Sequence, residues 1–161
     1  MKPDKFSFDH TMRELFEYSD PSFPLFIWTG DFRTFADNTT SCHWHHEFEY
    51  ATLLSGELDF HIDGQYVRLK RGESVFINSN ALHIATQAAD CGDAVMFTVS
   101  FPPSLLTGGN DGTMFRKFFQ PVVQSSVMGF IIDDSAHSGV EIAELLKEIY
   151  EIGRASCRER V

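Results

Sequence analysis

Residues 58–67 read LDFHIDGQYV, and this stretch decides the fold class. Apolar and polar side chains alternate over residues 58–62, as they do in a strand with one buried face. Asp63 and Gly64 then make a two-residue connection, and this pair favours a type I′ turn because both central residues need a positive φ. The stretch therefore predicts a β-hairpin.

Turn signals of the same kind recur on both sides of this hairpin. They divide the segment from residue 49 to 101 into short runs and lie at residues 55–56, 71–72, 78–80 and 91–93. Short strands at such regular spacing are typical of an antiparallel sandwich or barrel. Residues 23–29 are rich in strand formers and predict a first strand. We therefore expect a mainly β fold with the barrel over residues 23–101.

The flanks of the barrel have a different character. Residues 1–22 predict a loose N-terminal arm. Residues 102–152 predict a short helix that ends at Pro121, one more strand within residues 127–132, and a longer helix. The tail from residue 153 to 161 has no periodicity and reads as sequence foreign to the fold.

The longer helix carries an apolar stripe, and a capping-box spacing places its start at Ser138. The stripe consists of Ile142, Leu145, Leu146 and Ile149. It must be buried either on the barrel or against a second copy of the chain, and the pattern leaves both open. We expect it to support a homodimer.

Length, composition and charge indicate one globular domain and argue against some kinds of partner. The 161 residues suffice for one domain with a short appendage, and 43% hydrophobic with 22% charged residues is typical of a globular protein. The net charge of −10 argues against direct nucleic-acid binding, which needs clustered Lys and Arg. The sequence contains no polybasic run and no long apolar run, so binding to a membrane is not expected. Three cysteines without a secretory signal predict reduced thiols and a cytoplasmic location.

Ligand-type side chains are densest in the run HWHHEFE at residues 43–49. In an extended segment the alternate residues His43, His45, Glu47 and Glu49 share one face. Two imidazoles and a carboxylate can therefore converge, and strand pairing can bring His83 beside them. Such donors suit Zn, Ni, Fe or Mn. The alternative is a polar barrel mouth that binds an organic ligand or nothing.

The run His43-x-His45-x3-Glu49-x6-Gly56 resembles the first cupin motif. This resemblance implies a double-stranded β-helix (jelly-roll) barrel, followed here by C-terminal α-helices. Cupins hold a metal inside the barrel through residues of two motifs.

A degenerate form of the second cupin motif begins at Gly72 and reads Gly72-x5-Asn78-x-Asn80-x2-His83. Asn78 stands where proline is usual, and Asn80 stands where glycine is usual. By this resemblance the metal ligands are His43, His45, Glu49 and His83.

A longer match is similar to the sensory domain of AraC-type transcription regulators. It covers residues 43–101 through the segments HWH, FEY, LLSGEL, IDGQY, LKRGE and FINSNALH. The resemblance implies a barrel that binds a small effector, C-terminal helices that pair two subunits, and a helix-turn-helix module, absent from these residues, that binds DNA. We accordingly expect no enzymatic activity. The alternative is a small metal-dependent cupin enzyme, an isomerase or a dioxygenase.

Three aromatic residues are candidates for stacking on the effector, namely Trp28, Tyr50 and Phe97. Large aromatic side chains line pockets as well as cores. Plain core packing is the alternative for each of them.

Overall fold

The structure is a computed structural model that describes residues 6–133, 135 and 137–158. Eight strands run through the described residues: β1 (Phe26–Asp31), β2 (Phe48–Ser55), β3 (Glu57–Ile62), β4 (Gln65–Lys70), β5 (Ser74–Ile77), β6 (His83–Gln87), β7 (Val95–Phe101) and β8 (Gly129–Ile132). The helical segments are η1 (Phe32–Thr34), η2 (Ala36–Asn38), α1 (Ser104–Thr107), η3 (Phe115–Phe119), α2 (Gln120–Val123) and α3 (His137–Arg158).

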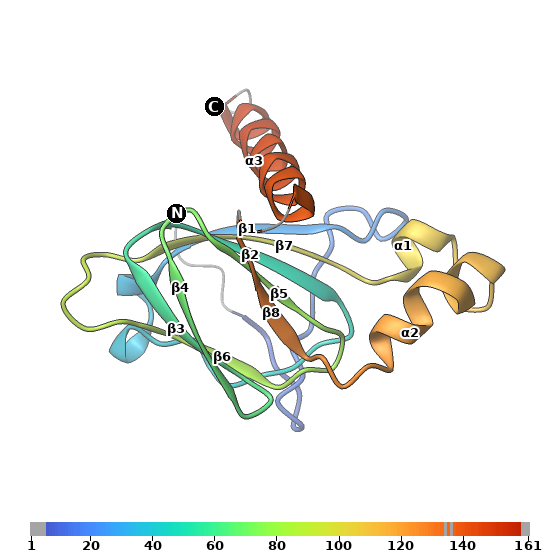
Figure 1. Cartoon of the computed structure of the whole chain (residues 1–161), viewed down its shortest axis with the longest axis horizontal. Helices are drawn as coiled ribbons and strands as arrows, with labels where there is room; N and C mark the ends of the chain where they lie inside the picture. The colour runs from blue at the N-terminus through green and yellow to red at the C-terminus, as the bar shows by residue number, and fades with distance from the viewer. Residues whose placement is uncertain (1–5, 134, 136, 159–161) are drawn as a thin grey trace.

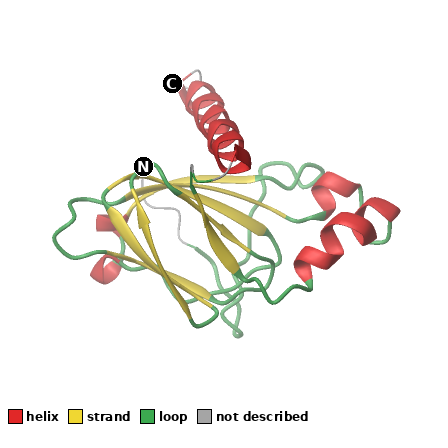
Figure 2. Ribbon diagram, viewed as in Figure 1, coloured by secondary structure: helices red, strands yellow, loops and turns green. Residues whose placement is uncertain are grey.

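The strands form two antiparallel sheets that enclose the core, while the helices lie outside them (Figure 1, Figure 2). One sheet has the order β1-β7-β2-β5-β8, and the other has the order β4-β3-β6. Buried apolar side chains from both sheets meet between them in one cluster. The prediction of a mainly β fold is confirmed.

The predicted hairpin of residues 58–67 is the β3–β4 pair. Leu58, Phe60 and Ile62 are buried, and the register runs from Glu57 opposite Lys70 to Ile62 opposite Gln65. Asp63 and Gly64 both have positive φ, 47° and 83°. Their conformation is the one that a type I′ turn requires.

The sheet does not end at residue 101, contrary to expectation. β8 pairs with β5 from Ser74 opposite Ile132 to Ile77 opposite Gly129, and so adds an edge strand to the five-stranded sheet. This edge strand lies inside the expected segment 127–132. One strand of the C-terminal region, β8, is therefore part of the barrel wall.

Two helix boundaries also differ from the expected ones. Helical structure continues past Pro121 to Val123, because Pro121 lies in the first turn of α2, where its missing N–H removes no hydrogen bond. α3 begins at His137, so Ser138 lies inside the helix instead of capping it. The helix runs on to Arg158 and therefore does not stop at residue 152.

The apolar stripe of α3 packs on the outer face of the five-stranded sheet. Leu146 is buried against Phe97 and Val99, and Ile142 and Ile149 cover the same cluster. Leu145 points away and is 58% exposed. Most of the stripe is therefore used within the chain, and the dimer stays a prediction.

Among the described residues, no helix combines the length and the apolar character that crossing a membrane requires. Cys42 and Cys91 are free thiols.

Candidate metal centre

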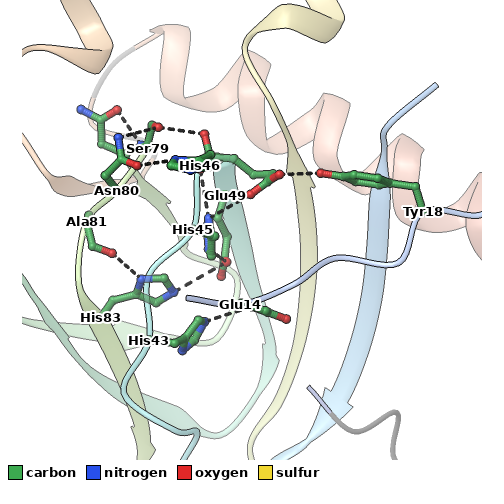
Figure 3. A network of polar contacts seen from close by, with 12 residues as sticks. Glu14, Tyr18, His43, His45, His46, Glu49, Ser79, Asn80, Ala81 and His83 are labelled. Atoms are coloured by element: carbon green, nitrogen blue, oxygen red, sulfur yellow. Dashed lines mark hydrogen bonds and ion pairs between the residues drawn. The ribbon is translucent and has the colours of Figure 1, made fainter. Parts of the chain in front are cut away.

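Backbone pairing brings the two histidine-bearing segments together (Figure 3). His43 and His83 lie opposite each other and exchange both backbone hydrogen bonds, with N···O distances of 3.0 and 2.8 Å. The N–H of Asn80 donates to the carbonyl of His45 at 2.7 Å. These bonds tie the segment before β2 to the turn before β6, and they place the three rings side by side.

The turn before β6 keeps its shape although its usual residues are replaced. Asn80 occupies the position where glycine is usual and has φ of 65°, a left-handed conformation that asparagine tolerates better than most residues. Asn78 is fully buried, and its side-chain amide donates to the carbonyls of Val122 and Val127 at 2.8 and 2.9 Å. The altered turn therefore still directs His83 into the barrel.

Each of the three histidine rings is fixed by a backbone carbonyl. The Nδ1 atoms of His43, His45 and His83 lie 2.7, 3.1 and 2.9 Å from the carbonyl oxygens of Ser41, Glu47 and Ala81. A carbonyl only accepts, so each Nδ1 carries its proton and, in the neutral ring, Nε2 keeps a free lone pair. One ring nitrogen from each histidine lies within 4.8 Å of the other two.

Two buried carboxylates face these rings. The Oε2 atom of Glu49 is 3.0 Å from Nε2 of His45 and 3.8 Å from Nε2 of His83. The Oε2 atom of Glu14 is 3.2 Å from Nε2 of His43. Figure 3 shows all five side chains converging from the arm, the segment before β2, β2 and the start of β6.

The charges of this cluster follow from burial and hydrogen bonding. Burial alone would raise the pKa of Glu49, but the hydrogen bond from His45 and the charges of the histidines lower it to about 2. Burial and the neighbouring His43 lower the pKa of His83 to about 3. Burial also opposes a charge on His45, yet the hydrogen bond to Glu49 raises the pKa of this ring overall. Glu49 is therefore ionised at neutral pH, and His83 is neutral.

This arrangement fits a metal cation. A proton on His45 satisfies Glu49, but Nε2 of His83 is buried without a hydrogen-bond partner among the described residues. A cation between the rings would satisfy all three nitrogens and the carboxylate together. Histidines that bind metals usually donate their second N–H to a carbonyl or carboxylate, as all three do here. The donor set of imidazole and carboxylate suits a divalent transition metal.

The N-terminal arm covers the rings and contributes to the site. Its residues pair with the segment before β2, where the N–H of Glu14 donates to the carbonyl of Trp44 at 2.9 Å. Phe16 contacts the ring of His45 edge-on, with centroids 5.3 Å apart. Tyr18 donates to the Glu47 carboxylate at 2.5 Å; burial, followed by this bond, raises the pKa of the phenol. The described part of the arm, residues 6–22, is therefore packed instead of loose.

Glu14 is a residue of the site that no sequence motif predicts. It is a single glutamate in a segment without periodicity, and only its backbone pairing with Trp44 brings it to His43. Glu47, which shares a face with Glu49 in an ideal strand, turns to Tyr18 and orients His45 through its carbonyl. Residues before β2 do not follow strict strand alternation.

A small chamber adjoins the cluster inside the barrel. Its volume is about 30 Å³, and His43, Glu49 and His83 form part of its wall. A water needs roughly 10–15 Å³ of such space, so the chamber has room for about two. Trp28, one of the three expected effector residues, lies in this wall as well.

Tyr50 and Phe97 lie on the other side of the sheet, so the expectation that they stack on a ligand in the barrel is wrong. Tyr50 packs on Phe76 and Phe101, and Phe97 packs on Tyr150 of α3. Alternation along the strand explains this placement: each residue directly follows or precedes one whose side chain points inward.

Comparisons with known proteins find similarity to one family and to several individual proteins. The Cupin domain family (Cupin_2) matches residues 35–100. The chain is similar to the uncharacterized HTH-type transcriptional regulator YdeC of Bacillus subtilis (strain 168), with 27% identity over 88 residues. That match covers 53% of this chain but only 30% of the relative.

Two solved structures are also similar. A predicted oxalate decarboxylase from Thermotoga maritima has 29% identity and a TM-score of 0.37, over 40% of this chain and 56% of that chain. The Cnp3 cupin domain from Schizosaccharomyces pombe has 10% identity and a TM-score of 0.46, over 58% of this chain and 65% of that chain. Over residues 35–100 this chain is therefore similar to cupin domains, and its two antiparallel sheets agree with that similarity.

Proposed function

We propose that this cupin domain binds one divalent transition metal and serves as the sensory domain of an AraC-type transcription regulator. The metal ligands in this proposal are His43, His45, Glu49 and His83. The observation that carries it is the geometry of the rings: three tethered Nδ1 atoms, and ring nitrogens that approach within 4.8 Å of one another around a buried carboxylate. A bound Zn, Ni, Fe or Mn ion would supply a Lewis acid at the chamber wall.

Two observations support the regulatory part of the proposal. The first is the similarity to an HTH-type transcriptional regulator. The second is the net charge of −10, which disfavours contact between this domain and DNA phosphates. We therefore assign DNA binding to a helix-turn-helix module of the full-length protein, and we assign effector binding, in a cytoplasmic homodimer, to this domain.

The arm gives the effector a physical means of action. Phe6, Glu14 and Phe16 help to close a chamber that has room for only about two waters. An effector as large as a sugar needs more space, so it must displace arm side chains to reach the histidines. The binding energy of the effector then shifts the equilibrium between the packed and the released arm. In a sensory domain, this shift is the change that is transmitted to the DNA-binding module.

Metal analysis of protein purified without a histidine tag tests the metal centre. We expect about one equivalent of metal in the wild type and none in His45→Ala. His61→Ala is the matched control, because His61 is exposed on β3 and contacts Tyr66 instead of the cluster. This control should keep the metal.

Either of two results would contradict the metal proposal. Wild-type protein that stays metal-free after incubation with Zn, Ni, Fe(II) and Mn would do so, and so would equal metal contents in the two variants. The regulatory part is tested with the full-length protein, by measuring promoter DNA affinity with and without the metal. An affinity that does not respond to metal or effector would remove the sensory role.

A metal-dependent cupin enzyme is the second candidate. The observation that favours it is the chamber itself, which borders three of the four ligands and can hold a small reactant beside the metal. An isomerase or dioxygenase activity that is lost on chelation and restored by one equivalent of metal would establish this alternative.

A further inference from the structure

Two hydroxyl groups on β7 point into the barrel and lack protein partners. Thr98 and Ser100 are 4% and 0% exposed, and neither hydroxyl oxygen has a hydrogen-bond partner among the described residues. Residues two apart on a strand share a face, so both hydroxyls lie on the inner surface. Buried polar groups are nearly always paired, and those that are not call for an explanation such as a bound ligand.

Both hydroxyls belong to the wall of the chamber at the metal centre. Ser100 lies directly opposite Glu49 in the β2–β7 register, and Thr98 lies opposite Ala51 on the same pair of strands. The chamber is lined by both, together with His43, Glu49 and His83.

The remaining wall offers few other hydrogen-bonding groups. It consists mainly of apolar and aromatic side chains, among them Phe26, Trp28, Phe60 and Met96. A ligand in the chamber would therefore find most of its hydrogen-bonding groups among the metal-ligating side chains and the two hydroxyls. The volume of about 30 Å³ limits that ligand to about two water-sized groups.

We propose that Thr98 and Ser100 form a subsite that hydrogen-bonds a small ligand, a water or an anion of two or three atoms, held beside the metal. This inference rests on the metal centre proposed above and adds the residues and the ligand class. A hydroxyl both donates and accepts, so the pair can serve a neutral or an anionic ligand. Thr98 and Ser100 are positioning residues in this role, since they do not contact the metal ligands in any described hydrogen bond.

Azide binding to the Co(II)-loaded protein tests the subsite. Azide is a triatomic anion, and its binding changes the visible spectrum of Co(II). We expect wild-type protein to bind azide, and the double variant Thr98→Val/Ser100→Ala to bind it at least about 10-fold more weakly, with unchanged Co(II) affinity. Thr52→Val is the matched control, because this hydroxyl bonds to Ser74 and lies outside the chamber wall.

Thermal denaturation of the metal-free protein provides a second measurement and does not depend on azide. Thr98→Val removes a hydroxyl that has no hydrogen-bond partner among the described residues, so it should lower Tm less than Thr52→Val, which removes a bond to Ser74. A larger fall than that of Thr52→Val would mean that protein groups already satisfy the Thr98 hydroxyl, and it would overturn the subsite.

The outcomes separate the subsite from the metal centre. Equal azide affinities in wild type and double variant, with normal Co(II) binding, would overturn the subsite and leave the metal centre intact. Failure of the wild type to bind Co(II) would overturn both. If the double variant does not fold, the single variants Thr98→Val and Ser100→Ala are compared in the same titration, and at least one of them must weaken azide binding.

Discussion

The inner and outer faces of β2 and β7 differ in chemistry, although they are formed by the same two strands. On the inner face, Glu49 and Ser100 border a small chamber together with His43 and His83. On the outer face, Tyr50 and Phe97 are packed under other apolar and aromatic groups, including those of α3. The inner face has buried polar atoms without a hydrogen-bond partner among the described residues, beside core residues such as Leu53 and Met96, and the outer face has a close-packed aromatic layer. We therefore expect the outer face to contribute to stability alone, and the inner face to contribute to both stability and ligand binding.

Phe97→Ala should have the largest effect, and it should act on stability alone. Phe97 is 1% exposed and packs on Leu146 and Tyr150, so its truncation should lower the free energy of unfolding by about 3–5 kcal/mol. Urea denaturation measures this loss. A variant that is folded in buffer should keep the metal affinity of the wild type. Loss of that affinity in folded protein would break the separation of the faces.

His83→Ala should act on metal affinity instead of stability. Nε2 of this ring has no hydrogen-bond partner among the described residues, so the substitution should weaken metal binding by about 100-fold or more, since even groups that only support a ligand are worth 10–100-fold. Competition with a chromophoric chelator measures the affinity, and Phe97→Ala serves as the control in that assay. Equal affinities for wild type and His83→Ala would exclude His83 as a ligand.

Asn80→Ala tests whether the turn before β6 positions His83. Alanine in the left-handed conformation of Asn80 costs roughly 1–2 kcal/mol, and the contact with His46 is lost as well. We expect a lower free energy of unfolding and a weaker metal affinity. Asn80→Gly is the control, because glycine adopts this conformation without strain. If alanine and glycine behave alike in both assays, the turn conformation does not position His83.

Leu145→Glu should have the smallest effect on stability. Leu145 is 58% exposed, and exposed substitutions usually stay within about 0.5 kcal/mol. If α3 pairs two subunits, as we expect, the charge should convert dimer to monomer in sedimentation velocity. Leu146→Glu is the contrasting variant, since Leu146 is buried on the barrel and its loss should destabilise the fold. A dimer that survives Leu145→Glu would remove this residue from the interface.

The sequence predicts the β architecture well because alternation and turn chemistry are local. The β3–β4 hairpin and the inward face of β3 follow directly from residues 58–67. The same alternation also assigns Tyr50 to the outer face, since it follows Glu49, but its aromatic character makes it a candidate for a pocket as well as for the core. Large aromatic residues serve both purposes, and only the packing of α3 and its neighbours decides.

The candidate site is predictable only where its residues belong to a spaced motif. His43, His45 and Glu49 follow from spacing, and His83 follows from the second motif. Glu14 has no such signal, because its position depends on a pairing 30 residues along the chain. The chamber hydroxyls likewise require the register of β7 against β2. Non-local pairing therefore limits what the sequence predicts.

The contacts of Asn78 determine where the chain can be truncated. Its buried amide is bonded to the carbonyls of Val122 and Val127, and its neighbouring strand β5 is paired with β8. A fragment that stops at Phe101 would leave this amide without acceptors and expose the edge of β5. During synthesis on the ribosome, the barrel wall would accordingly be completed only after Ile132 has emerged. Expression of a stable minimal domain therefore requires residues through at least Ile132.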